Sequence, residues 1–142
     1  MFNLKLQNDQ GKTNTLELEK DIAEFNGKTH KVKIHDGDIT KAGHISVNTL
    51  NIKAAYLDTI ITRFENRNRK VDKYPGFTGF CLIKKDNTIS VLTGWENREK
   101  FDEWVASTAY QEGHQQKQDR AEQQGSEYLV DRPIREHYSV IG

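Results

Sequence analysis

WENREKFDEWVASTAYQEGH, residues 95–114, is the segment around which the rest of this sequence can be arranged. Its first half predicts an amphipathic helix, because apolar side chains recur at positions i, i+3 and i+4: Phe101, Trp104 and Val105. Charged residues occupy the other side of that helix: Glu96, Arg98, Glu99 and Asp102. We therefore expect one apolar face that packs inward and one charged face in solvent.

Ser107 interrupts this pattern. Because serine is a good N-cap residue, it predicts a second helix that begins at Thr108 and carries His114 along a new axis. On one unbroken helix Trp104 and His114 would point about 80° apart, since each turn takes about 3.6 residues. The break at Ser107 therefore decides whether the two side chains meet, and we expect them to face one cavity.

Length and charge limit the classes to which the protein can belong. Its 142 residues are enough for one domain with a genuine core, and 21 basic against 21 acidic residues give no net charge. This balance favours neither a nucleic acid nor a membrane as partner, and the basic run at 63–70 is typical of a solvated helix end. The single cysteine, Cys81, lies in an apolar strand pattern that favours a buried thiol. With no disulfide, leader or membrane-spanning pattern, we expect a cytoplasmic protein.

Residues 1–42 predict a strand-rich N-terminal extension. Apolar and polar residues alternate near both ends of this section, with turn residues between them, while 20–26 leaves a short helical turn open. The section is too short and polar to form a rich core alone, so we expect it to pack on the domain that follows. The histidines in and beside it lack metal-ligand spacing and are interpreted as surface or half-buried residues: His30, His35 and His44.

Residues 43–142 predict the order strand, helix, strand, strand, helix, strand. The elements are expected at 44–52, 53–68, 77–85, 88–95, 95–114 and 135–141. This is the α+β, ferredoxin-like split βαβ arrangement, in which both helices lie on one face of an antiparallel sheet. Ile45 and Val47 point to the other face, which would lack a cover. We therefore expect a homodimer packed sheet to sheet, as a dimeric α/β barrel.

Asn48 lies on the same side of the first strand as Leu50 and Ile52, the side that the helices should cover. A buried amide that finds no partner costs on the order of 1–3 kcal/mol, so Asn48 needs one. Neighbouring backbone groups are one source of a partner. The other is a ligand in a pocket that Asn48 would share with Trp104 and His114 from the helices.

His114 is the candidate for a metal ligand, because a neutral imidazole can coordinate a metal or act as a base near neutral pH. The sequence has no HExxH motif, no CxxC pair and no second histidine spaced to complete a protein-only metal cage. It also has no nucleotide-binding glycine motif. A metal that brings most of its own ligands needs only one histidine, which makes haem, with His114 as axial ligand, the leading candidate.

At this point the sequence resembles a family, the IsdG-type haem-degrading monooxygenases of the antibiotic biosynthesis monooxygenase (ABM) superfamily. The resemblance covers about residues 43–142, and the long N-terminal section is similar to the HmoB-like branch. It rests on the following residues: Asn48, Phe64, Pro75, Gly76, Phe77, Trp95, Phe101, Trp104, Ser107, Tyr110 and His114.

The resemblance implies a catalytic triad of Asn48, Trp104 and His114. His114 would bind the haem iron, Asn48 would donate its amide towards iron-bound oxygen, and Trp104 would press the porphyrin out of plane. Phe77 and Phe101 would complete the haem-binding residues. Haem would be both substrate and cofactor, opened by dioxygen and electrons from an external reductase to a bilin-type product and free iron.

Two alternatives stay open at this level. The same superfamily includes cofactor-independent monooxygenases that act on quinol-like aromatics, and an aromatic pocket could hold such a substrate. Some relatives with an N-terminal extension resemble stress or signalling proteins, so the chain could instead be a non-enzymatic haem-binding protein.

Overall fold

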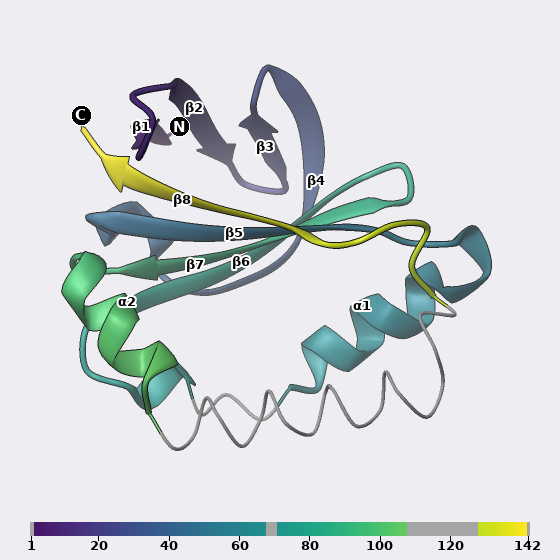
Figure 1. Cartoon of the computed structure of the whole chain (residues 1–142). Helices are drawn as coiled ribbons and strands as arrows, with labels where there is room; N and C mark the ends of the chain where they lie inside the picture. Colours follow the sequence, from purple (N-terminus) through teal and green to yellow (C-terminus); the bar gives the residue numbers. More distant parts are fainter. Residues whose placement is uncertain (1, 68–70, 108–127, 142) are drawn as a thin grey trace.

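Eight antiparallel strands pair side by side until the last meets the first, so that they form a closed barrel in the order β1-β2-β3-β4-β6-β7-β5-β8 (Figure 1). The computed structural model describes residues 2–67, 71–107 and 128–141. The strands are β1 Phe2–Asn8, β2 Thr13–Glu19, β3 Ile22–Phe25, β4 Lys28–Gly37, β5 His44–Asn51, β6 Phe77–Lys85, β7 Thr88–Trp95 and β8 Ile134–Val140. Two α-helices, α1 Leu57–Glu65 and α2 Arg98–Val105, lie on one side of β5, β6 and β7.

From β5 onward the elements follow the predicted order of strand, helix, strand, strand, helix, strand, which confirms the ferredoxin-like α+β fold. The hairpin of β6 and β7 has the expected bounds, with a turn at Asp86 in the left-handed region (φ 53°). The first helix is shorter than predicted, because a 3-10 turn at Ala54–Tyr56 precedes α1. No helix among the described residues is long and apolar enough to cross a membrane.

The N-terminal strands are part of the same barrel. β4 pairs with β6 and β1 pairs with β8, so β1 to β4 bridge the two edges of the ferredoxin-like sheet. The segment at 20–26, for which a helical turn was open, forms β3 instead, because its residues pair with β2 on one side and β4 on the other. The inward side chains make one core: Leu4, Leu6, Leu16, Ala23, Phe25, Ile39, Ala42, Ile45, Val47, Cys81, Ile83, Leu92 and Tyr138.

This closure corrects the reason given for a homodimer. Ile45 and Val47 were expected on an uncovered sheet face, but both are fully buried inside the barrel. Leu6 and Leu16, from the N-terminal strands of the same chain, belong to the core around them. A second copy is therefore not needed to cover this face, and the homodimer stays a sequence prediction that has lost its supporting argument.

Helix α1 covers a second apolar cluster on the opposite side of the sheet. Leu57, Ile60 and Ile61 are buried there against side chains from β5, β6 and β7. At the end of α1, Arg67 is not part of a solvated run as the sequence suggested, because only 13% of its side chain is exposed. Its guanidinium lies 3.8 Å from the centre of the Phe80 ring and pairs with two carboxylates, those of Asp36 (3.2 Å) and Asp72 (2.8 Å).

Side-chain hydrogen bonds mark both ends of helix α2. The Asn97 side chain caps it by accepting a hydrogen bond from the backbone N–H of Lys100 (3.0 Å). The helix ends at Val105, and the Ser107 hydroxyl donates to the carbonyl of Trp104 (2.6 Å). The predicted break near Ser107 is therefore confirmed, while the second helix expected from Thr108 lies outside the described residues.

Phe101 holds α2 on the sheet through two histidines, which we call the imidazole seat: His44 and His137. The Phe101 ring lies 5.4 Å from that of His44 and 5.1 Å from that of His137, and the two imidazoles are nearly parallel at 5.7 Å. His44 was expected near the surface, but it is only 2% exposed because Phe101 covers it; His30, at 8%, is also more buried than expected.

The imidazole seat is neutral at ordinary pH. Both ring nitrogens of His44 and Nδ1 of His137 are buried without a hydrogen-bond partner in the described part of the chain. Burial, helped by the positive charge of Arg98, lowers the pKa of His44 to about 4 and also lowers that of His137. The nearby carboxylates of Asp9 and Asp102 act in the opposite direction and do not offset the burial.

A substitution in β2 tests whether the N-terminal strands belong to the core. Leu16→Ala should lower the free energy of unfolding by about 3 kcal/mol, because Leu16 is fully buried and its truncation leaves a cavity. Urea unfolding followed by tryptophan fluorescence measures this. Ile22→Ala, at a residue 52% exposed, is the control and should change little. An unchanged midpoint for Leu16→Ala would contradict a shared core.

Acid should destabilise the protein through His44. Since the pKa of His44 is lowered from 6.5 to about 4 on folding, its stabilising contribution is complete above pH 6.5 and falls as the pH drops towards 4. As the pH is lowered from 7 to 4.5, wild type should lose on the order of 2–3 kcal/mol more of its unfolding free energy than His44→Phe loses. The exposed residue His35 supplies the control, His35→Phe, which should follow wild type. Parallel pH curves for His44→Phe and wild type would refute this reading.

Candidate functional site

Asn48 lies in the middle of β5, on the side that faces the helices. On this side His44 contacts α2 at one end of the strand, and Leu50 packs in the cluster under α1 at the other. Asn48 therefore stands between the areas that the two helices cover, which Figure 1 shows at opposite ends of the sheet. Its predicted place on the face of Leu50 and Ile52 is correct.

The side-chain oxygen of Asn48 finds no partner among its described neighbours. This Oδ1 atom is buried and accepts no hydrogen bond in the described part of the chain. The cross-strand residues directly opposite are Val91 on β7 and Arg135 on β8. The alternative in which neighbouring backbone groups pair with the side-chain oxygen is therefore not what the structure shows, and the oxygen remains available to a ligand.

Trp104 is half-buried and fixed by other aromatic rings. Its indole packs on Tyr74 at 5.2 Å between ring centres and lies nearly parallel to Trp95 at 6.3 Å. The Tyr74 hydroxyl also donates to the carbonyl of Glu103 (3.2 Å), which ties this ring to α2. Trp104 is thus a rigid surface rather than a freely rotating side chain.

Phe77 and Phe101, the other two expected haem contacts, meet the same ring system. Each packs against Trp95, with ring centres 5.5 Å and 5.8 Å away at steep angles. Trp95 itself is fully buried, and its indole N–H donates to the hydroxyl of Thr93 (3.1 Å). The structure therefore gathers Phe77, Phe101 and Trp104 around one buried indole at the α2 end of the sheet.

His114 lies outside the described residues, as does the polar stretch 115–126 that follows it. The structure therefore describes two residues of the expected triad, Asn48 and Trp104. That His114 shares a pocket with them stays a prediction. Sequence reasoning missed three residues that pack against Phe101 and Trp104: Tyr74, His44 and His137. None of the three carries a local sequence signal for this packing.

Two other chemistries receive no support from the described residues. No group of three or more histidine, cysteine or acidic side chains among them is placed to hold a metal ion. Cys81 is buried in the barrel as predicted, and burial raises its pKa to about 12, so its thiol is not a nucleophile near neutral pH.

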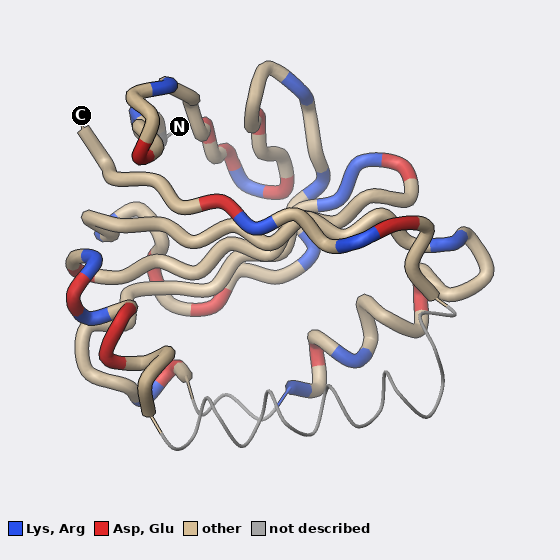
Figure 2. The backbone as a smooth tube through the Cα atoms, viewed as in Figure 1, with Lys and Arg blue, Asp and Glu red and all other residues tan. Residues whose placement is uncertain are grey.

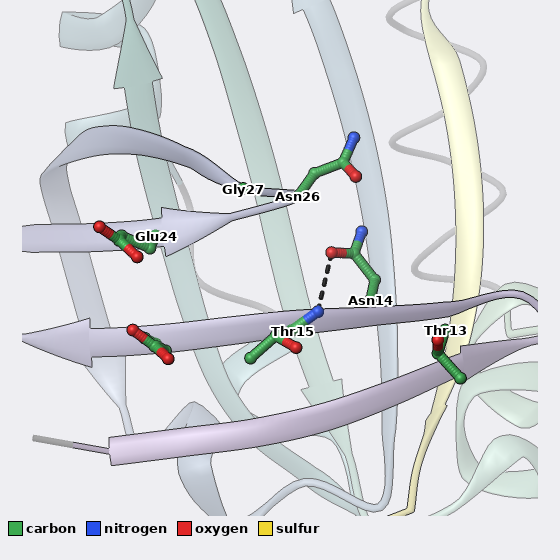
Figure 3. Close-up of a pocket in the computed structure, with 7 residues that line it drawn as sticks. Thr13, Asn14, Thr15, Glu24, Asn26 and Gly27 are labelled. Atoms are coloured by element: carbon green, nitrogen blue, oxygen red, sulfur yellow. Dashed lines mark hydrogen bonds between the residues drawn. The ribbon is translucent and has the colours of Figure 1, made fainter.

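A hollow of about 300 Å³ lies elsewhere, on the N-terminal strands β2 and β3 (Figure 3). Polar side chains line it, and Glu17 stands directly opposite Glu24 across the two strands. Two of its lining residues, Thr15 and Asn14, are joined by a hydrogen bond from the backbone N–H of Thr15 to Asn14 Oδ1 (2.8 Å). Polar walls and two facing carboxylates do not suit a flat, largely apolar ligand, and none of the expected site residues lines this hollow.

Known proteins share this sequence pattern. Residues 44–116 match the model of the family described as Antibiotic biosynthesis monooxygenase. A heme-degrading monooxygenase from Bacillus cereus is 31% identical over 96 residues, 63% of this chain and 83% of that protein. A heme oxygenase (mycobilin-producing) from Mycobacterium tuberculosis is 31% identical over 68 residues, 46% of this chain and 65% of that protein.

Solved structures share the fold. A heme-degrading enzyme from Listeria monocytogenes superposes with a TM-score of 0.63 at 16% identity, over 96% of this chain and 83% of that one. An uncharacterised ferredoxin-fold protein from the same species reaches 0.65 at 11% identity, over 99% and 80%. The likeness to these two concerns the fold alone. Together with the sequence match over about half of the chain, it confirms the resemblance: the chain belongs to the antibiotic biosynthesis monooxygenase family.

Proposed function

We propose that this protein is a haem-degrading monooxygenase, which uses dioxygen and electrons from an external reductase to open the porphyrin ring and release iron with a bilin-type product. Family membership supports an oxidative enzyme, and the relatives named for haem degradation support haem as the substrate. The observation that carries the proposal is the buried, unpartnered Oδ1 of Asn48 between the two helices. We expect a cytoplasmic location, since the single cysteine, Cys81, provides no disulfide framework of the kind common in secreted proteins.

The described residues fit a flat aromatic substrate. Haem supplies the iron centre at which dioxygen reacts. Asn48 brings an amide to a largely apolar surface, where its N–H can donate a hydrogen bond to an oxygen atom and its oxygen can accept one from a water. Trp104, held by Tyr74 and Trp95, offers a rigid surface against which a macrocycle can be bent.

His114 completes the proposal as the residue that would hold the haem iron through its imidazole. The iron would supply the centre for dioxygen chemistry, and Asn48 would donate its side-chain N–H towards dioxygen. Neither a flavin nor a nicotinamide motif occurs in the sequence, so the electrons are expected from a separate donor.

Titration with hemin tests the ligand. Wild-type protein should give a stoichiometric shift of the Soret band, and His114→Ala should weaken binding by at least about tenfold, because the iron loses its protein ligand. The exposed His35 provides the matched control, since His35→Ala should bind like wild type. Absence of a Soret shift with wild-type protein would end the haem proposal; oxygen consumption with a quinol-like substrate in haem-free protein would then favour the cofactor-independent alternative.

Replacing Asn48 separates function from stability. Asn48→Leu removes a buried oxygen that has no partner among the described residues and lies near aliphatic side chains. The free energy of unfolding should therefore stay unchanged or rise by up to about 1 kcal/mol. Conversion of bound haem to a bilin-type product, followed by absorbance with ascorbate as reductant, should nevertheless fall by on the order of 100-fold, since an oriented donor is lost.

The wild-type protein gives the reference for this comparison. A variant that turns haem over at the wild-type rate would remove Asn48 from the mechanism. A wild-type haem spectrum that never bleaches with reductant and oxygen would instead favour the non-enzymatic haem-binding alternative.

A further inference from the structure

We propose that Arg135 binds a carboxylate of the ligand that Asn48 faces, namely a propionate of haem under the proposed function on which this inference rests. The register of β5 and β8 places the two residues directly opposite each other. Directly paired residues of antiparallel strands point to the same face, with Cβ atoms about 5 Å apart. An amide and a guanidinium therefore stand side by side on the face that the helices flank.

The charges around His137 agree with this placement. Burial is the main reason that the pKa of His137 is lowered, and the positive charges of Arg98 and Arg135 add to it. The guanidinium of Arg135 is thus close enough to act on His137, which packs against Phe101 on the helix side of the sheet. Arg135 and His137 are two residues apart on β8, so both lie on its helix side and not on the side of the barrel interior.

Arg135 has no carboxylate partner in the described part of the chain. It differs in this from Arg67 and Arg98, which both form ion pairs. Glu136, the next residue along β8, is opposite Val47 on the barrel-facing side and accepts a hydrogen bond from the Tyr138 hydroxyl (2.8 Å). The charge of Arg135 is therefore not neutralised locally.

The place of Arg135 at the rim leaves it open to a ligand. β1 pairs only with the stretch of β8 at 138–140, so beyond that stretch no strand runs along this side of β8 in the described residues. Arg135 is exposed, while Asn48 beside it is half-buried. A planar ligand could rest its apolar body near Asn48 and direct a carboxylate outward to the guanidinium, whose fork matches a carboxylate in two parallel hydrogen bonds.

Esterified haem makes the test specific for the carboxylate. Dissociation constants of hemin and of hemin dimethyl ester are measured for wild type, Arg135→Gln and Arg135→Lys. Arg135→Gln should weaken hemin binding about tenfold, as expected when a charge-assisted hydrogen bond is lost, and leave the ester unaffected. Wild type should bind hemin dimethyl ester more weakly than hemin by a similar factor. Arg135→Gln should bind the ester and hemin with nearly the same dissociation constant. Arg135→Lys should fall between them, because it keeps the charge without the fork.

Lys33→Gln controls for the loss of one positive charge. Lys33 is exposed on β4, which β6, β7 and β5 separate from β8 in the strand order, so this variant should bind both forms like wild type. Figure 2 shows basic residues spread over the strands rather than gathered at one place, so a general charge effect would affect both variants equally. Equal losses on esterification for wild type and Arg135→Gln would overturn this inference, while turnover of hemin would leave the proposed function standing. Wild-type protein that binds no hemin would overturn both.

Discussion

Every second side chain of β5 points into the barrel, and those between them point towards the two helices. Ile45 and Val47 on the inner side are sealed by core residues from the N-terminal strands. On the outer side, His44 and Leu50 lie under α2 and α1, and Asn48 lies between them. Because the period of a strand is two, this division cannot shift by one residue without exposing the core, and it fixes which face can hold a ligand.

Because the chain's own strands close the barrel, the core that stabilises the fold lies inside it, and the candidate site lies on the outer, helix side. The interior is filled with aliphatic side chains, the aromatic rings of Phe25 and Tyr138 and the neutral thiol of Cys81, so no chemistry is expected there. The helix side carries the unusual groups instead: the side-chain oxygen of Asn48, which has no hydrogen-bond partner among residues 2–67, 71–107 and 128–141, and the exposed guanidinium of Arg135 opposite it. Helix α2 rests on this side through the packing of Phe101 against His44 and His137.

Local patterns in the sequence were sufficient for much of the fold. Alternation in β5, β6 and β7 and the spacing of Phe101 and Trp104 predicted those elements, and the same alternation placed Asn48 on the helix side. These features depend on residues close in sequence, where strand and helix periods act directly.

Other features depend on contacts between distant residues, which periodicity cannot show. The burial of His44 requires Phe101 and His137 to cover it, and the burial of Ile45 requires β4 to pair with β6 and β1 with β8. Arg67 looked like one of several solvated cations until the fold brought Asp36 to it. For the same reason the support of Trp104 by Tyr74, thirty residues earlier in the chain, had no sequence signal.

The central claim, that haem binds on the helix side of β5 at Asn48, is tested most directly by NMR of side-chain amides. Spectra of the protein loaded with hemin are compared with those of protein loaded with gallium protoporphyrin, which has the same shape and no unpaired electrons. If haem binds there, the side-chain amide signals of Asn48 are broadened by iron only, while those of Asn14 in β2 and Asn26 in the turn between β3 and β4 stay sharp. Broadening at Asn14 and Asn26 with an unaffected Asn48 would contradict it.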